Sequence, residues 1–363
     1  MRKTGWLVAG ALAAGVAWKL RDIPDSMGAV PTGVRADRVR RSPQFNGVAF
    51  ANSAPAVVTP REESTKILRD LLFGREQRRP RGAVPVVHPA PDPISDLDIV
   101  WYGHASVLVE IEGRRVMFDP VWSDRCSPVP FAGPRRNHKP PTPLDMLPKL
   151  DAIVISHDHY DHLDMRTVQA LTGFQDAPFV VPLGVGAHLE RWGVPESRIV
   201  ELDWNESVTI RGLELTVTEA RHFSGRAFTR NTTLWGSWVV AGERRKVFYT
   251  GDSGYFEGYA EIGRRHGPFD VALVQIGAYS ENWPDIHMTP EEAVRAHIDL
   301  NAGLLVPVHW CTFTLAFHSW GEPVDRLWRE AKGRGVHLAV PKPGERFAVS
   351  EPPLVDGWWQ QIE

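Results

Sequence analysis

The strongest constraint in this sequence is a nine-residue segment, 156–164, that follows a short apolar run and reads Ser-His-Asp-His-Tyr-Asp-His-Leu-Asp. Imidazole and carboxylate side chains are ligands for zinc and other first-row metal ions. A tight loop after a strand can turn alternate side chains inward, so we expect His157 and His159 to face one ion. Asp161 and His162 then lie on the far side, where a second ion can bind. A merely polar loop would not concentrate three of the chain's 14 histidines in this way.

Composition argues against some classes of protein. The formal net charge of the 363 residues is -3 at pH 7, which argues against a nucleic-acid surface as the main partner. The two cysteines, Cys126 and Cys311, cannot form a disulfide framework, so the fold does not depend on an oxidising compartment. The 14 tryptophans are many for this length; they suit membrane interfaces and apolar binding sites, but most are expected to fill the core.

The N-terminus carries an apolar run at 5–18, flanked on both sides by lysine and arginine. As a helix it would be about 21 Å long, which is shorter than the hydrocarbon core of a bilayer, about 30 Å. Its length suits the apolar part of a signal peptide, but the polar segment that precedes a cleavage site is missing. We therefore expect residues 1–21 to be a membrane anchor. Export after signal cleavage and a cytoplasmic location are the alternatives.

Residues 22–96 have the composition of an extended arm rich in proline and arginine, with one short helix predicted over 62–73. The arginine clusters suit anionic lipid headgroups, although a solvated extended segment is the simpler interpretation.

From residue 97 to 350 we expect one layered α/β domain, followed by a tail at 351–363. Two or three helices are predicted in the domain. One is capped by Asp164, and another begins at Thr289, where Pro290 and Glu292 complete a capping box. Apolar runs predict strands at 99–102, 107–111, 115–118, 151–155, 179–181, 199–202, 213–218, 235–240, 246–249, 271–276, 304–308 and 337–339.

Three later residues extend the candidate metal site. His222, Asp252 and His309 each follow an apolar, strand-like run, a position from which a rigid sheet can present ligands into a cleft. Taken singly, each has an ordinary alternative, a hydrogen-bonded core histidine or an aspartate in a tight turn. Together with segment 156–164 they make a set of seven candidate ligands.

This set resembles the dinuclear site of the metallo-β-lactamase superfamily. Further motifs resemble its N-acylphosphatidylethanolamine-hydrolysing phospholipase D branch, and the resemblance extends from about residue 44 to 347. The motifs are Trp-Tyr-Gly-His-Ala-Ser at 101–106, Leu-Trp-Gly-Ser-Trp at 234–238, Gly-Pro-Phe-Asp at 267–270, Gly-Ala-Tyr at 277–279, Pro-Glu-Glu-Ala-Val at 290–294 and His-Trp at 309–310.

The resemblance implies a four-layer αβ/βα sandwich with two zinc ions at one edge, although iron or manganese would suit the same ligands. It assigns to the first ion His157, His159 and His222, and to the second Asp161, His162 and His309. Asp252 would bridge the two ions together with a hydroxide. With Asp161 and Asp252 as catalytic carboxylates, the implied enzyme is a phosphodiesterase in which this hydroxide attacks the phosphorus of a phospholipid such as N-acylphosphatidylethanolamine, at a membrane surface.

Four other residues are candidates for supporting roles. Asp119 and His104 could orient metal ligands by hydrogen bonds, or merely stabilise turns. His287 resembles a branch position near the headgroup and is a candidate donor to the leaving oxygen, and His318 is a weaker candidate for substrate binding. Two other functions suit the same pattern: a lactonase or β-lactamase-like hydrolase, and a non-enzymatic envelope protein that keeps a structural metal site. The sequence gives no indication of an oligomeric state.

Overall fold

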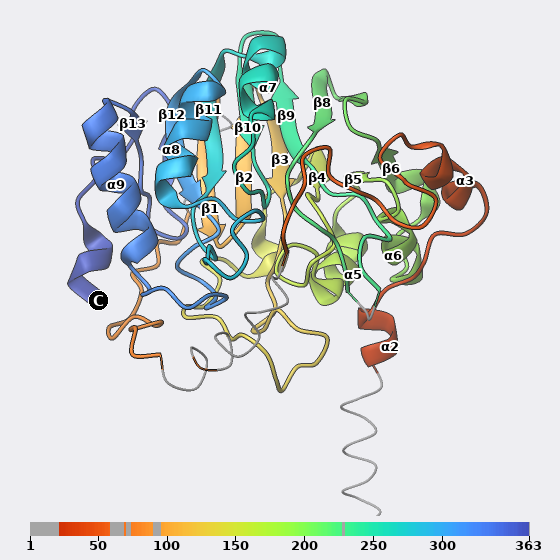
Figure 1. The fold of residues 1–363 in the computed structure, drawn as a ribbon, viewed down its shortest axis with the longest axis horizontal. Helices are drawn as coiled ribbons and strands as arrows, with labels where there is room; N and C mark the ends of the chain where they lie inside the picture. The colour runs from red at the N-terminus through yellow and green to blue at the C-terminus, as the bar shows by residue number, and fades with distance from the viewer. Residues whose placement is uncertain (1–21, 59–68, 70–73, 90–95, 227–228, 363) are drawn as a thin grey trace, which may run out of the picture.

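The computed structural model describes residues 22–58, 69, 74–89, 96–226 and 229–362 (Figure 1). The predicted anchor at 1–21 lies outside the described residues, as does the predicted helix at 62–73 apart from Arg69. Across the described part of the chain, no helix has both the length and the apolar character required to cross a bilayer.

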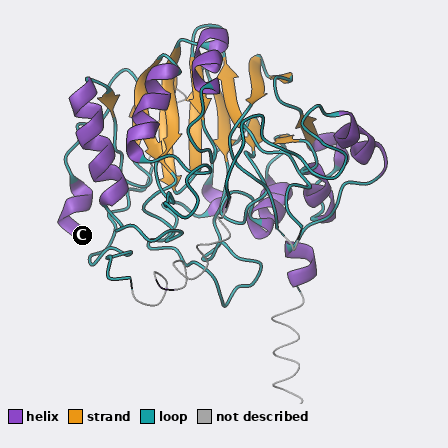
Figure 2. Cartoon of the chain, viewed as in Figure 1, coloured by secondary structure: helices purple, strands orange, loops and turns teal. Residues whose placement is uncertain are grey.

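Two seven-stranded mixed sheets pack face to face, and helices cover their outer sides (Figures 1 and 2). The first sheet contains, in spatial order, β14 (Arg346–Ala348), β1 (Leu97–Gly103), β2 (Ser106–Ile111), β3 (Arg114–Phe118), β4 (Ala152–Val154), β5 (Phe179–Pro182) and β6 (Ile199–Leu202). The second contains β13 (His337–Leu338), β12 (Ala302–Val308), β11 (Phe269–Gln275), β10 (Lys246–Tyr249), β9 (Ser237–Ala241), β8 (Leu213–Thr218) and β7 (Ser207–Ile210). The expected αβ/βα sandwich is confirmed.

Both sheets change from antiparallel to parallel pairing halfway across. In the first sheet the pairs from β14 to β3 are antiparallel and those from β3 to β6 are parallel. The second sheet is antiparallel from β7 to β10 and parallel from β10 to β13. Because parallel strands end at the same edge of a sheet, the segments that follow them can meet in one cleft.

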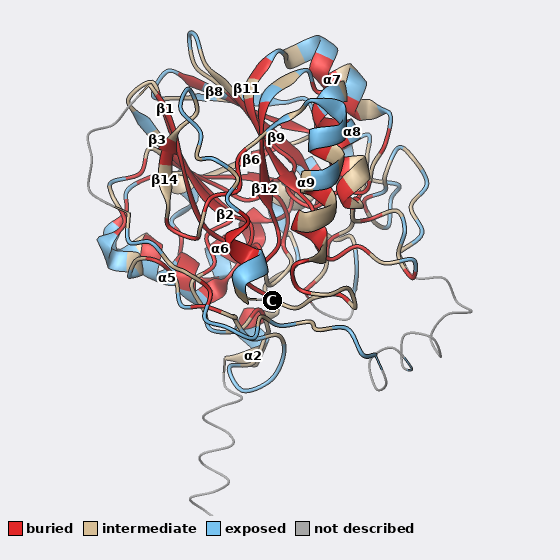
Figure 3. Cartoon of the chain, turned by 90° about the vertical axis from the view of Figure 1, so that its left-hand side faces the viewer, coloured by how far each residue is buried: buried red, intermediate tan, exposed pale blue. Residues whose placement is uncertain are grey.

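The strand sequences are apolar because both faces of each sheet are covered. Along β4, Ala152 and Val154 point into the main core between the sheets, whereas Ile153 points to a second core under helices. This is the alternation of a strand with two buried faces. Figure 3 shows the buried residues concentrated in the sheets and the exposed ones on the outer helices.

Five helices belong to the two outer layers. Packed on the first sheet are α5 (Met165–Phe174) and α6 (Gly186–Arg191), and over the second lie α7 (Gly258–His266), α8 (Pro290–Asp299) and α9 (Glu322–Arg334). Both predicted helix starts are confirmed. The Asp164 side chain accepts a hydrogen bond from the Arg166 backbone at the start of α5, and Thr289 and Glu292 form the capping box of α8.

Prediction from sequence underestimates the number of elements in the domain. It missed three helices (α6, α7 and α9), two strands (β7 and β14) and the single-turn 3-10 helices η2 (Leu144–Met146) and η3 (Glu196–Arg198). Most of them are short or strongly polar. In α9, however, buried Val324, Leu327 and Ala331 recur at helical spacing, so its pattern was legible. The strand predicted from Trp235 begins two residues later, because Gly236 turns to donate its N–H to Ser156 O at 3.0 Å.

The prediction of an extended, solvated arm before β1 is corrected for residues 22–58. This stretch contains α2 (Ile23–Ser26) and α3 (Gly33–Arg41), and it packs on the domain. Val39 and Phe50 are buried in the main core, and Arg35 forms an ion pair with buried Glu201. Val39 and Phe50, which hold this stretch against the domain, are too far apart in the sequence to form a periodic pattern.

The predicted C-terminal tail also belongs to the folded body. A 3-10 helix, η4 (Trp358–Ile362), buries Trp358 and Trp359 in the main core. Trp359 Nε1 donates a hydrogen bond to Asp325 Oδ1 of α9 at 2.7 Å. The tryptophans hold this segment in place through apolar burial, which its proline-rich start did not suggest.

Candidate metal centre

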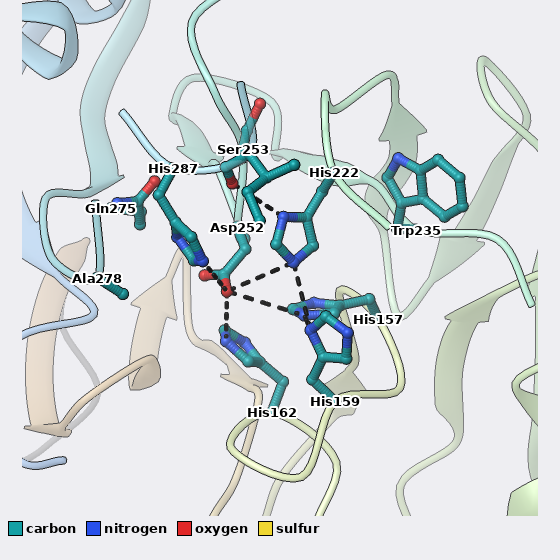
Figure 4. A network of polar contacts seen from close by, with 12 residues as sticks. His157, His159, His162, His222, Trp235, Asp252, Ser253, Gln275, Ala278 and His287 are labelled. Atoms are coloured by element: carbon teal, nitrogen blue, oxygen red, sulfur yellow. Dashed lines mark hydrogen bonds and ion pairs between the residues drawn. The ribbon is translucent and has the colours of Figure 1, made fainter. Parts of the chain in front are cut away.

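The seven predicted ligands converge at one edge of the two sheets. His157, His159, Asp161 and His162 lie on the loop after β4 of the first sheet. The others follow strands of the second sheet: His222 after β8, Asp252 after β10 and His309 directly after β12. Figure 4 shows the Asp252 carboxylate in the middle, with imidazole rings around it.

The first group of donor atoms comprises His157 Nε2, His159 Nδ1, His222 Nε2 and a carboxylate oxygen of Asp252, all within 4.8 Å of one another. His159 Nδ1 lies 2.8 Å from His157 Nε2 and 3.3 Å from His222 Nε2. Asp252 Oδ2 lies 3.8 Å from the His157 nitrogen and 3.7 Å from the His222 nitrogen. Ligands at the corners of a tetrahedral zinc site are about 3.3 Å apart, so the group has the required size.

The second group contains Asp161, His162 and His309, together with His104. Asp161 Oδ2 lies 3.5 Å from His162 Nε2 and 3.2 Å from His309 Nε2. Asp252 Oδ2 reaches these two nitrogens as well, at 3.2 Å and 3.1 Å. The Asp252 carboxylate is therefore shared between both groups, which is the position expected of a bridging ligand.

Unsatisfied polar atoms provide an independent test of this fit. His162 Nε2 and Asp252 Oδ1 are buried and have no hydrogen-bond partner among the described residues. Buried polar atoms without a partner are costly unless something else satisfies them. A divalent cation bound between these side chains would supply the missing interaction, so the residues present fit a metal centre.

In two of the candidate ligands, a hydrogen bond at Nδ1 fixes the tautomer of the ring. His162 Nδ1 lies 2.7 Å from Asp119 Oδ2, and His222 Nδ1 lies 2.9 Å from the carbonyl oxygen of Ile286. Because both partners are acceptors, Nδ1 carries the proton in each ring and Nε2 is free to bind a cation. Asp119 thus occupies the place predicted for it beside a ligand histidine.

Electrostatics also favour cation binding. Burial lowers the pKa of both His157 and His222 well below the ordinary value, so these rings are neutral. Burial would raise the pKa of Asp252, but the neighbouring histidines hold it well below its usual range. Neutral imidazoles and an ionised carboxylate are the forms that bind metal, so the first group is ready for a cation. Burial lowers the pKa of His162 and His309, but the Asp252 carboxylate raises it above the ordinary value, so these two rings must release a proton when metal binds.

Comparison with known proteins identifies the protein family. Residues 114–310 match the β-lactamase superfamily domain. The chain belongs to the β-lactamase superfamily. An uncharacterised protein of Mycobacterium tuberculosis is 50% identical over 372 residues, covering 99% of this chain and 100% of its own. N-acyl-phosphatidylethanolamine-hydrolysing phospholipase D 1 of Caenorhabditis elegans is 38% identical over 246 residues, 64% of this chain and 69% of its own.

Other relatives agree with this assignment. A metal-dependent hydrolase of Pyrobaculum aerophilum is 29% identical over 255 residues, covering 70% of this chain and 100% of its own. A solved metallo hydrolase from Ignicoccus hospitalis shares the fold, with a TM-score of 0.54 at 23% identity over 69% of this chain and 97% of its own. The protein is thus a metal-dependent hydrolase of the β-lactamase superfamily, and the predicted relation to the phospholipase D branch is confirmed.

Within this superfamily site, His104 and His287 lie beside the ligand groups. His104 Nε2 is 2.9 Å from Asp161 Oδ2, so it contacts a ligand carboxylate as a supporting residue would. Burial lowers its pKa to about 3. His287 Nε2 lies 3.9 Å from Asp252 Oδ2, and His287 forms a third candidate ligand group with Asp252 and His309. Burial lowers the His287 pKa to about 3 as well.

Both ring nitrogens of His318 contact backbone groups. Its Nε2 accepts from the Ala278 backbone N–H at 3.1 Å, and its Nδ1 lies 3.0 Å from the carbonyl oxygen of Ser319. The ring also stacks on Tyr279 with centroids 4.6 Å apart. Because both ring nitrogens are engaged by backbone groups, the ring positions Ala278, which lines the cleft, and the predicted substrate contact stays a prediction.

Sequence reasoning missed the network that holds the metal loop. Asp158 Oδ1 accepts from the Gly225 N–H at 2.7 Å, and its Oδ2 lies 3.2 Å from His188 Nε2. The Arg226 guanidinium donates to the carbonyl oxygens of Asp158 and Leu163 at 2.7 Å and 2.6 Å. Asp158 could have been suspected from its place between two ligands, whereas nothing local marked His188 or Arg226.

Proposed function

We propose that this protein is a two-zinc phosphodiesterase of phospholipase D type that acts on a phospholipid such as N-acylphosphatidylethanolamine. The observation that carries the proposal is the sharing of Asp252 Oδ2 by two donor groups, 3.1 Å from His309 and 3.7 Å from His222. These two donor groups would each hold one cation. The related phospholipase D of Caenorhabditis elegans supports the choice of a phosphodiester over other esters.

Two bound divalent ions would make hydroxide available at neutral pH and neutralise the charge of phosphoryl oxygens. The chain's own residues shape the cleft of about 240 Å³ that opens at the centre. The exposed Arg230 guanidinium, 5.2 Å from the Phe223 ring, adds positive charge at its wall. Phe223, Trp283 and Leu315 supply apolar surface. This combination suits a substrate that has an anionic phosphate and hydrocarbon chains.

His287 lines the same cleft, 3.9 Å from Asp252. We propose that its ring donates a hydrogen bond to the leaving alcohol oxygen. In the overall reaction, an oxygen from water joins phosphorus, the phosphorus–oxygen bond to the headgroup breaks, and the released alcohol takes up a proton.

The experiment is hydrolysis of a defined N-acylphosphatidylethanolamine in ¹⁸O-labelled water. We expect label in phosphatidic acid and none in the released N-acylethanolamine. Label in the alcohol would show attack at carbon, and label in a freed fatty acid would show acyl hydrolysis. Turnover of lactones or nitrocefin without diester cleavage would favour a lactonase or β-lactamase-like enzyme. Protein that contains metal but is inert towards all of these would favour the structural role.

Metal content is tested separately. We expect elemental analysis of the active protein to give two zinc ions per chain, whereas one ion, or predominantly iron or manganese, would overturn this part of the proposal.

We also propose that residues 1–21 attach the protein to a membrane surface. Deletion of residues 1–20 should leave hydrolysis of a soluble diester unchanged and move the protein to the soluble fraction. If the shortened protein still sediments with membranes, this segment is not the anchor.

A further inference from the structure

The stretch before β1 reaches the candidate metal centre through one side chain. Asn52 lies in a segment without helix or strand, 170 residues before His222 in the sequence. Its Nδ2 donates to the carbonyl oxygen of His222 at 2.8 Å, and its Oδ1 accepts from the His222 backbone N–H at 3.1 Å. The amide therefore pairs with both backbone groups of a candidate metal ligand.

The same amide is held in place by a neighbouring indole. Trp235 Nε1 donates to Asn52 Oδ1 at 3.1 Å and to the carbonyl oxygen of Ala220 at 2.9 Å. Trp235 is 1% exposed, so the indole cannot move without disturbing the core. On the far side of His222, the Ile286 carbonyl fixes the ring through Nδ1. The backbone and the ring of His222 are thus fixed by two different parts of the chain.

This fixation matters because His222 has no strand to restrain it. β8 ends at Thr218, and among the described residues that follow, no strand begins before Ser237, so His222 lies in a long connection. Its neighbour Arg221 forms an isolated bridge with Gly254, but His222 itself is in no strand. By contrast, His309 directly follows strand β12, which is paired on both sides, with β11 and β13. Side chains that orient a metal ligand are needed most where the backbone alone does not fix it.

We infer that Asn52 is a positioning residue for the first metal ion, acting through the backbone of His222, and that the stretch before β1 is therefore part of the metal centre. The inference rests on the proposed two-ion centre. The expected effect is selective. Asn52 contacts His222, a ligand of the first group, so the metal affinity of the second group should not depend on Asn52.

The test measures the release of zinc from full-length protein to a chromophoric chelator that competes for each ion. The release step that disappears in His159→Ala identifies the first ion. Asn52→Ala is expected to weaken that step by about 10- to 100-fold and to leave the other step unchanged. Asn46→Ala is the matched control, because Asn46 Oδ1 also accepts from two backbone N–H groups, those of Val48 and Ala49, but in an exposed turn.

Equal weakening of both steps, a change in the second step alone, or no change would overturn the inference. If Asn52→Ala does not fold, Asn52→Asp decides the question, because it keeps the acceptor for the His222 N–H and replaces the donor to the His222 carbonyl oxygen by a carboxylate oxygen. Asn52→Asp should weaken the first step relative to the parent protein and leave the other step unchanged, and an unchanged first step would overturn the inference. If the parent protein releases a single ion, the two-ion proposal fails. The Asn52 inference then survives only if His159→Ala abolishes that ion's binding and Asn52→Ala weakens it.

Discussion

Replacement of Asp119 by asparagine tests whether this carboxylate fixes the tautomer of His162. Asp119 is fully buried, and every group that contacts its oxygens in a hydrogen bond is a donor. Oδ2 accepts from His162 Nδ1 at 2.7 Å, Ser156 Oγ at 2.6 Å and the Tyr249 hydroxyl at 2.5 Å, while Oδ1 accepts from the Ser156 backbone N–H at 2.7 Å. An asparagine keeps the shape but replaces one acceptor by an NH₂ donor.

Either orientation of the new amide creates a conflict. With NH₂ towards His162, the imidazole can accept only if its proton moves to Nε2, and that nitrogen can then no longer bind an ion. With NH₂ towards Ser156, a backbone N–H that cannot rotate faces another donor. A buried donor without an acceptor costs about 1–3 kcal/mol. Loss of a group that orients a ligand histidine weakens metal binding by about 10- to 100-fold, or about 1.4–2.8 kcal/mol.

We therefore expect Asp119→Asn to weaken binding of the second ion by about 10- to 100-fold. Binding of the first ion should weaken less, because His157 Nδ1 is linked to Asp119 indirectly, through Ser156 Oγ. The free energy of unfolding of the metal-free protein should fall by about 1–3 kcal/mol. Chelator competition measures the first quantity and urea unfolding the second. Asp176→Asn, the same chemical change at a side chain that is 94% exposed, is the control. Parent affinity at both sites in Asp119→Asn would refute the reasoning, as would selective loss of the first ion.

Three further predictions concern the centre itself. Asp252→Ala should lose high affinity for both ions, a larger effect than the roughly 10- to 100-fold of a supporting residue, and elemental analysis that still finds two ions would contradict the bridging role. His287→Asn should keep both ions and lower kcat by about 10²- to 10⁴-fold, whereas loss of metal would make His287 a ligand. In the metal-free protein, burial lowers the pKa of His309, but the Asp252 charge and hydrogen bonds to Asp161 and Asp252 raise it to about 9. Because the folded pKa is raised, the stabilisation from protonated His309 is complete below about pH 6.5 and is lost as pH rises through 9. Over that range the stability of the metal-free protein should fall and its zinc affinity should rise. A thermal unfolding temperature and a zinc affinity that do not change between these pH values would contradict this.

The parts of the site that could be predicted from sequence are those encoded locally. Four candidate ligands fall within 157–162, and the apolar run before them predicts the strand that presents them. His222, Asp252 and His309 were legible because each follows an apolar run. Resemblance added the pairing of these residues into two groups, and the structure places the atoms accordingly.

The parts that could not be predicted depend on contacts between distant segments. Asn52 and His222 are 170 residues apart, and the hydrogen bond from Arg226 to the Ser26 carbonyl joins residues 200 apart. No periodicity or spacing signals such pairs, because each partner is an ordinary residue in its own segment. The same limit applies to the stretch at 22–58: its arginines predict a solvated segment, and only the fold brings Glu201 beside Arg35.

The tryptophans illustrate how such distant contacts position the centre. We expected most of the 14 to fill the core, and Trp101, Trp235 and Trp238 are indeed fully buried. Each also donates its indole N–H to a backbone carbonyl close to a candidate ligand: Trp101 to His104 at 2.8 Å, Trp235 to Ala220 at 2.9 Å and Trp238 to Ile155 at 3.0 Å.

The last of these bonds crosses from β9 of the second sheet to the loop after β4 of the first. The ligands come from both sheets, so their separation is correct only if the sheets keep a fixed relative position. An aliphatic side chain could fill the same volume but could not make a directional bond across the core. We conclude that these tryptophans are used because they join packing to the placement of the ligands.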